Sequence, residues 1–186
     1  MRAPKITPLA IDGLLLIEPR RFGDVRGFFS ETYSKPDLLA AGIDIAFVQD
    51  NHSLSPLKGT LRGLHFQGPP QAQAKLVRVT RGAALDVAVD IRKGSPTYGR
   101  HVTVELSAEN WLQLLIPPGF AHGYMTLTPD CELLYKVSAP YAPETEGGLL
   151  WRDPALGIDW PLPPAEVTAN ARDDSYAGFG EFVSPF

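Results

Sequence analysis

The residues best suited to chemistry lie in one short apolar segment, residues 60–67 (TLRGLHFQ), where Arg62 and His65 stand among leucines and a phenylalanine. A histidine changes its charge near pH 7, so it can act as a general base, a general acid or a metal ligand. If the segment is a strand, Arg62 and Leu64 share one face, while His65 and Leu61 share the other. A lone histidine in such a strand is more often a half-buried residue bonded to a neighbouring carbonyl. Taken alone, His65 therefore only suggests a catalytic base.

A second histidine follows a rigid Pro-Gly turn in residues 116–123 (IPPGFAHG). The Pro-x-Gly-x-x-His spacing that ends at His122 resembles the second motif of cupin jelly rolls, in which that histidine binds a metal. A cupin metal site usually also takes an H-x-H pair and a carboxylate. Here Gln67 stands two residues after His65, and the remaining two histidines lie far from any paired spacing. We therefore expect no bound metal.

Other kinds of chemistry have little support in the sequence. Cys131 lies in an expected buried strand, and no G-x-S-x-G turn offers a serine nucleophile. No G-x-G-x-x-G or Walker sequence is present, so the usual signals for dinucleotides and nucleoside triphosphates are absent. Acid-base chemistry by His, Tyr, Lys and Asp remains, without a cofactor.

The composition describes an ordinary globular chain with many turns. Its 186 residues fit one domain, residues 1–186, and 17 Gly with 18 Pro indicate short elements joined by tight turns. A net charge of -4 argues against nucleic acid or an anionic membrane as a partner, although a local basic cluster could still bind one small anion. Residues 1–10 contain no apolar stretch of signal-peptide length, and the single Cys131 cannot form an intrachain disulfide. We expect a soluble, cytoplasmic protein.

Strict alternation of apolar and polar residues is the clearest structural pattern. Leu85, Val87, Val89 and Ile91 would share one face of a strand, and the same period recurs in residues 101–106. Further strands are expected at residues 14–17, 75–79, 112–116 and 132–137, with one short helix at 36–41 that Gly42 could end. Residues from about 161 onward are expected to wrap the β core as loops and short turns. These elements predict an all-β sandwich or barrel.

A series of short blocks across nearly the whole chain carries a family resemblance. In chain order they are FGDVRGFFSE at 22–31, FVQDNHS at 47–53, LRGLHFQ at 61–67, QAKLVRV at 73–79, DVAVDIRKGSPTYG at 86–99, IPPGFAHGY at 116–124, LLYKVSAPYAPETEG at 133–147, WRDP at 151–154 and IDWP at 158–161. They resemble the dTDP-4-dehydrorhamnose 3,5-epimerases, cupin-fold isomerases of dTDP-L-rhamnose biosynthesis. The resemblance implies a double-stranded β-helix jelly roll with short helical turns, forming a homodimer.

The resemblance also implies a role for particular residues. The family's base corresponds to His65, its partner carboxylate to Asp173, its proton-donating phenol to Tyr135, and the ammonium near the sugar ketone to Lys75. Positions that line the nucleotide-sugar site correspond to Arg26, Glu31, Gln49, Asn51, Arg62, His122, Glu146 and Arg172, and Tyr141 corresponds to the aromatic that stacks on thymine. The resemblance implies that some of these residues reach a neighbouring subunit's site. Counting back from the terminal SPF places Asp173 on the family's aspartate, and a loop shifted by one residue would place Asp174 there.

The implied reaction suits these residue types. A ketone at C4 acidifies the hydrogens on C3 and C5, because the resulting carbanion delocalises onto the ketone oxygen as an enolate. Asp173 would orient His65, Lys75 would stabilise the enolate, with His122 as a possible helper, and Tyr135 would reprotonate the opposite face. Neither NAD nor pyridoxal phosphate is then required. Arg62, with Arg172 as a second candidate, would hold the diphosphate.

Three other functions remain open at this point. The chain could be an epimerase that acts only at C3 of a related 4-keto nucleotide sugar, since the same base would serve. It could be a non-catalytic sugar-nucleotide-binding cupin that has kept the pocket. It could also be a metal-dependent cupin oxygenase or isomerase.

Overall fold

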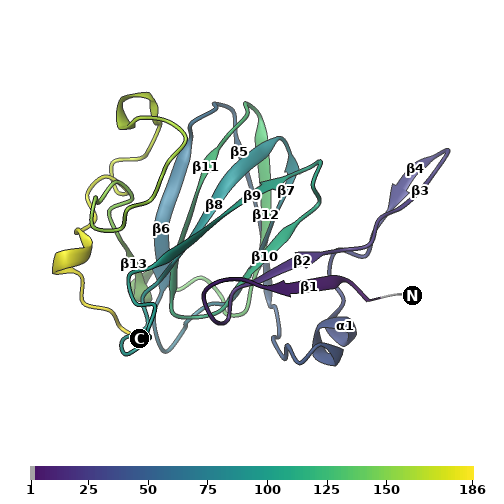
Figure 1. Cartoon of the computed structure of the whole chain (residues 1–186), viewed down its shortest axis with the longest axis horizontal. Coiled ribbons are helices and arrows are strands. Elements are labelled where there is room, and N and C mark those ends of the chain that lie inside the picture. The colour runs from purple at the N-terminus through teal and green to yellow at the C-terminus, as the bar shows by residue number, and fades with distance from the viewer. Residues whose placement is uncertain (1–2) are drawn as a thin grey trace.

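Two antiparallel β-sheets form the body of the chain, whose residues 3–186 are described by a computed structural model (Figure 1). The larger sheet has six strands in the order β1 (Lys5–Pro8), β2 (Leu15–Glu18), β10 (Gln113–Ile116), β7 (Lys75–Arg81), β12 (Cys131–Val137), β5 (Gln49–Ser55). The smaller has five in the order β13 (Glu146–Gly148), β6 (Leu61–Gln67), β11 (Phe120–Thr126), β8 (Ala83–Asp90), β9 (His101–Ser107). This is a cupin-type jelly roll, so the expected all-β fold class is confirmed.

The remaining elements are short. Strands β3 (Phe22–Asp24) and β4 (Gly27–Phe29) form a separate hairpin that projects from the body in Figure 1. The helical pieces are α1 (Lys35–Ala40) and the 3-10 turns η1 (Pro143–Thr145), η2 (Pro164–Glu166) and η3 (Phe179–Glu181). Helix α1 begins one residue before the expected range: the Ser34 hydroxyl accepts from the Asp37 amide, and Gly42 follows the helix with a φ of 82°. Within residues 3–186, no helix is long and apolar enough to cross a membrane.

The apolar core between the sheets draws on both of them. The larger sheet contributes Val77, Leu114 and Leu133, and the smaller contributes Leu106 and Phe120, all of them buried. Removing this apolar surface from water is the main stabilising contribution to such a sandwich. The core occupies one part of the space between the sheets and leaves the rest to polar groups.

A second apolar cluster lies on the outer face of the smaller sheet. There Val87 and Met125 pack against Leu149, Trp151 and Leu156 of the C-terminal segment, residues 149–186. In Figure 1 this segment runs beside β6 and β13. The smaller sheet is therefore buried on both faces, and the C-terminal segment is held where it can contribute to a site at β6.

Strand β8 shows how this double burial arises. The predicted shared face of Leu85, Val87 and Val89 is confirmed, and it packs beneath the C-terminal segment. The opposite face places Asp86 and Ala88 toward the space between the sheets, where both are fully buried. A carboxylate on that face is thus an interior group.

Strand β6 corrects the alternation expected from the sequence. Leu61 and Leu64 both pack in the outer cluster. Arg62 and His65 instead lie opposite Tyr124 and His122 of the neighbouring strand β11. Alternation from Arg62 would place Leu64 with it, but the register shifts between these two pairs at a bulge. As a result, Arg62 and His65 share the inner face.

Gly63 makes the bulge possible. Its φ is 143°, and a Cβ built there would lie 2.5 Å from the Cα of Gly123 on the neighbouring strand. Only glycine fits this conformation and this close approach of two backbones. The bulge at Gly63 therefore directs the His65 side chain into the space between the sheets.

Candidate active site

A histidine and a carboxylate meet at the junction of β6 and the C-terminal segment. His65 Nε2 lies 2.6 Å from Asp173 Oδ1, and the Gly63 amide donates to Asp173 Oδ2 at 3.3 Å. The Asp173 side chain is fully buried, whereas 25% of the His65 side chain is exposed. Because an ionised carboxylate only accepts, the proton of a neutral His65 sits on Nε2, and the lone pair on Nδ1 is free to act as a base.

The neighbouring aspartate, Asp174, contacts other residues than His65. Asp174 Oδ1 accepts from the Trp151 indole at 3.1 Å and lies 3.5 Å from Arg152. The loop register therefore presents Asp173, and not Asp174, to His65. Asn170 supports this register, since its side-chain oxygen accepts from the Asp173 amide at 2.8 Å.

A cavity of about 280 Å³ opens in front of His65. The predicted residues that line it are Gln49, Asn51, His65, Lys75, Tyr135, Tyr141 and Glu146, and Phe66, Gln67 and Gln73 complete the wall. His65 enters from the smaller sheet, whereas Lys75 and Tyr135 enter from the larger one. A small molecule in this cavity would thus meet a base on one side and a phenol and an amine on the other.

Lys75 lies next to the base. Its Nζ donates to the His65 carbonyl at 3.5 Å. Burial lowers the pKa of Lys75 to about 8, although the negative charges of Asp86 and Glu146 oppose that shift. The amine is therefore still mostly charged at pH 7 and can stabilise a developing oxyanion.

Tyr135 is a neutral acid in this setting. Burial raises the pKa of its phenol, and nearby Tyr124 adds to the shift, while Arg62 opposes it. The phenol therefore keeps its proton at neutral pH. Tyr124 lies deeper, with its hydroxyl 2.9 Å from the Ser53 hydroxyl.

A second histidine–carboxylate pair lies beneath the cavity, and its carboxylate was not singled out from the sequence. His122 Nε2 lies 2.9 and 3.0 Å from the two oxygens of Asp86, and both side chains are buried. Burial lowers the pKa of His122, although Asp86 opposes the shift. The only sequence signal for Asp86 is a charged residue inside an apolar, alternating strand.

The mouth of the cavity carries a linked set of polar groups. The Tyr141 hydroxyl donates to Glu146 Oε2 at 2.8 Å, the Arg172 guanidinium pairs with Glu146 Oε1, and Arg172 Nε donates to the Tyr176 hydroxyl at 2.8 Å. Burial opposes ionisation of Glu146, but the bonds from Arg172 and Tyr141 outweigh it and lower its pKa. Tyr176 has no distinguishing sequence signal, and only the folded loop brings it here.

Two predicted residues lie apart from the cavity in this single chain. Arg26, at the turn of the β3–β4 hairpin, donates from Nε to Asp24 at 3.1 Å. Glu31 lines a different, small cavity near α1. Arg62 lies on the inner face of β6, where its guanidinium donates weakly to the Leu54 carbonyl at 3.5 Å.

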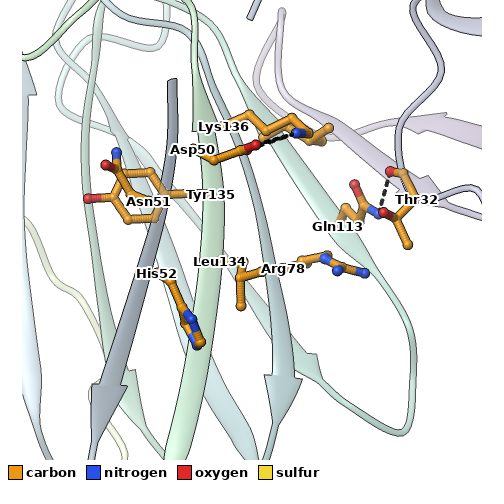
Figure 2. Close-up of a pocket in the computed structure, with 10 residues that line it drawn as sticks. Thr32, Asp50, Asn51, His52, Arg78, Gln113, Leu134, Tyr135 and Lys136 are labelled. Carbon is orange, nitrogen blue, oxygen red and sulfur yellow. Dashed lines mark hydrogen bonds and ion pairs between the residues drawn. The ribbon is translucent and has the colours of Figure 1, made fainter. Parts of the chain in front are cut away.

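A second cavity of about 310 Å³ is lined by residues of β5 and β12 that include Asn51 and Tyr135, which line the first cavity as well. Figure 2 shows Asn51 and Tyr135 to one side of these strands and Asp50, Arg78 and Lys136 to the other. Lys136 pairs with Asp50 at 2.8 Å, so its charge is neutralised. This cavity holds no buried base and carboxylate comparable to His65 and Asp173.

The histidines also bear on metal binding. Among residues 3–186, no three His, Cys, Asp or Glu side chains gather closely enough to hold a metal ion. His65 and His122 each bond to a carboxylate through Nε2. The donor sets are thus arranged as acid-base pairs.

Comparison with known proteins identifies the family. The family model described as dTDP-4-dehydrorhamnose 3,5-epimerase matches residues 8–181. The enzyme of that name from Sinorhizobium fredii is 58% identical over 178 residues, which cover 96% of this chain and 91% of the relative. The one from Salmonella typhimurium is 55% identical, over 82% of this chain and 84% of the relative.

Solved structures agree with the sequence relatives. A dTDP-6-deoxy-D-glucose-3,5-epimerase from Legionella pneumophila, in complex with dTDP-4-keto-L-rhamnose, matches with a TM-score of 0.91 at 45% identity, covering 97% of this chain and 95% of that one. A 3'-monoepimerase from Streptomyces bikiniensis, in complex with dTDP-quinovose, matches with a TM-score of 0.86 at 37% identity, covering 93% and 87%. With its family model, its curated relatives and its fold in agreement, the chain belongs to the dTDP-4-dehydrorhamnose 3,5-epimerase family.

Proposed function

We propose that this enzyme inverts C3 and C5 of dTDP-4-dehydro-6-deoxy-D-glucose and so forms dTDP-4-dehydro-L-rhamnose in dTDP-L-rhamnose biosynthesis. The observation that carries the proposal is the placement of the His65–Asp173 pair and Tyr135 on opposite sheets of one cavity, with Lys75 beside them. Inversion needs a base on one face of the sugar and an acid on the other. This cavity supplies both.

The proton transfers follow from the hydrogen bonds. His65 Nδ1 takes the proton from C3 or C5, and the C–H electron pair moves into an enolate whose oxygen is O4 of the sugar. Asp173 stabilises the imidazolium that forms, and Lys75 neutralises the enolate oxygen. Tyr135 then donates its phenolic proton to the opposite face of the carbon. Exchange with solvent restores the proton on Tyr135 and removes the one on His65.

Binding of the nucleotide falls to groups around the mouth. Tyr141, whose ring is exposed there, would stack on thymine, and Gln49, Asn51 and Glu146 would take polar contacts. Arg62 is our first candidate for the diphosphate, because its strongest contact in the free protein is a single weak bond. Arg172 is second, since Glu146 already engages its charge.

A homodimer would account for the two predicted residues that lie apart from the cavity. The β3–β4 hairpin carries Arg26 and exposes Phe22, Phe28 and Phe29, and Glu31 follows it. Exposed aromatics on a projecting hairpin are typical of a surface that another chain covers. We propose that the hairpin packs on a second copy and brings Arg26 and Glu31 to that copy's site.

The reaction as proposed needs no cofactor or metal, because the C4 ketone of the substrate is the electron sink. No nucleic acid or membrane takes part in it. A cytoplasmic location suits the single free thiol, Cys131, which is buried.

Epimerisation at C3 alone is the second candidate, favoured by the likeness to the 3'-monoepimerase. Incubation of the protein with the substrate in deuterated water separates the two. We expect deuterium at both C3 and C5, measured by NMR and mass spectrometry. Label at C3 only would establish the monoepimerase, and no label at all would indicate a non-catalytic sugar-nucleotide-binding protein.

A further inference from the structure

The loop that supplies Asp173 lies on the surface. Its residues 171–175 form a turn, residues 170–176 belong to no strand, and the neighbouring β13 is an edge strand of three residues. Asp173 nevertheless reaches inward and is fully buried. The 2.6 Å contact with His65 therefore requires that something hold this loop against β13.

We propose that the Glu146–Arg172 ion pair is a latch that fixes the loop so that Asp173 meets His65, and that both are positioning residues for the base. The proposal rests on the function proposed above, in which His65 is the base. In this proposal Glu146 and Arg172 bind each other, in addition to any contact that either makes with the nucleotide.

The latch joins β13 directly to the loop. Arg172 is the residue before Asp173, and its guanidinium bonds Glu146 Oε1 on β13 and the Tyr176 hydroxyl within the loop. Because Arg172 and Asp173 are adjacent, a shift of the backbone at Arg172 moves the backbone that carries the Asp173 carboxylate. A planar guanidinium with two fixed partners restricts rotation more than a single contact does.

Glu146 is itself held in one orientation. Tyr141 donates to its Oε2 at 2.8 Å, which leaves Oε1 directed at Arg172. The side chain of Glu146 is 16% exposed, so water competes little for its oxygens. The carboxylate is thus a fixed acceptor, as a latch requires.

Tyr176 packs the loop onto the same strand. Its ring meets the His65 ring edge to face with centroids 5.8 Å apart. A Cβ on Gly148 of β13 would lie 2.4 Å from the Tyr176 ring, so the ring lies directly against the glycine backbone. Arg172 fixes the hydroxyl end of this ring, and the latch therefore acts on His65 from two sides.

Other contacts keep the loop folded without the latch. Leu150 N donates to Ala177 O at 3.0 Å, and the Trp151 indole donates to Asp174 at 3.1 Å. Surface ion pairs also contribute little to global stability. Loss of the latch should hence change the precision of the His65–Asp173 contact without unfolding the protein.

The first experiment uses the ligand-free protein, so that it does not depend on turnover. The hydrogen bond between His65 Nε2 and Asp173 is followed by the ¹H and ¹⁵N NMR shifts of the His65 ring in the wild type and in Glu146→Gln, Arg172→Met and the double variant, with Asp173→Asn as the reference for a lost partner. We expect each latch variant to move the His65 ring shifts toward those of Asp173→Asn. We expect the double variant to match the single ones, because either change opens the same latch.

The second experiment measures turnover against pH. Misplacement of a catalytic group by about 1 Å costs on the order of 100-fold, so the latch variants should lose about 10- to 100-fold in kcat. The loss should appear in kcat rather than in KM. Glu18→Gln, a matched carboxylate-to-amide change in the surface pair with Lys5, should leave kcat and pH profile unchanged.

The outcomes are distinguishable. A rise in KM with unchanged kcat and unchanged His65 ring shifts would overturn the latch and leave both residues as substrate contacts only. A wild-type protein that exchanges no deuterium would refute the proposed function, whereas the NMR comparison would still decide whether Glu146 and Arg172 position Asp173.

Discussion

Two histidine–aspartate pairs lie side by side in this molecule, on the neighbouring strands β6 and β11, and their surroundings differ. His65 and His122 are register partners, and each bonds a carboxylate through Nε2. The partner of His65 comes from a surface loop, and the His65 ring faces the cavity. The partner of His122 is Asp86 on strand β8, and only 7% of the His122 side chain is exposed.

The difference shows what separates a base from a structural pair. A base must exchange protons with a substrate and with solvent, so it needs an open ring nitrogen and a partner that stabilises its charged form. His65 has both. His122 is enclosed, and burial keeps its pKa low, so it remains neutral. We infer that the second pair shapes the floor of the site.

Among substitutions that keep both histidines, the largest expected effect comes from Asp173→Asn. The amide can no longer stabilise an imidazolium and can favour the wrong tautomer, so kcat should fall roughly 10²- to 10⁴-fold. Steady-state kinetics would measure this, with Asp174→Asn as the matched control that keeps near wild-type kcat. A larger loss for Asp174→Asn than for Asp173→Asn would reverse the assignment of the loop.

Lys75 should limit activity at alkaline pH. Its pKa is about 8, so the amine loses its charge, and with it the stabilisation of the enolate, as the pH rises through that value. Replacement by Met should cost on the order of 100-fold in kcat, the usual size of one lost oxyanion contact.

Lys75→Arg tests the cause of this alkaline limb. A guanidinium stays charged across the range, so a reduced but pH-independent kcat above pH 8 is expected. An alkaline limb of the same midpoint in Lys75→Arg would contradict the role of the amine and would implicate another group.

The smallest effect on turnover is expected at the enclosed pair. Asp86→Asn keeps the shape but weakens a buried, charge-assisted bond, so it should cost about 1–3 kcal/mol of unfolding free energy. The loss in kcat should stay within about tenfold, since Asp86 is one contact removed from the cavity. Denaturant unfolding and kinetics measured together would check this. A loss in kcat as large as that of Asp173→Asn would remove the distinction between the two pairs.

Much of the fold could be predicted from the sequence, because alternating apolar residues mark strands directly. Strand β8 and its apolar face follow from that pattern alone. The family blocks supplied His65, Lys75 and Tyr135, which no local pattern distinguishes from core residues.

The remaining features depend on contacts that are distant in the sequence. The bulge at Gly63 shifts His65 relative to Leu61, and it arises from a close approach to Gly123 on another strand. Asp86 becomes an interior group because its face of β8 points into the space between the two sheets, while the C-terminal segment covers the apolar face. The alternation of apolar and polar residues along one strand cannot predict either feature.

The most direct test of the central claim, a base and an acid on opposite sides of one sugar, is deuterium exchange by two variants. His65→Ala and Tyr135→Phe are each incubated with the 4-keto nucleotide sugar in deuterated water, and C3 and C5 are followed by NMR. We predict no label with His65→Ala, and measurable label with little inverted product with Tyr135→Phe. Label entering at the wild-type rate with His65→Ala would contradict the account.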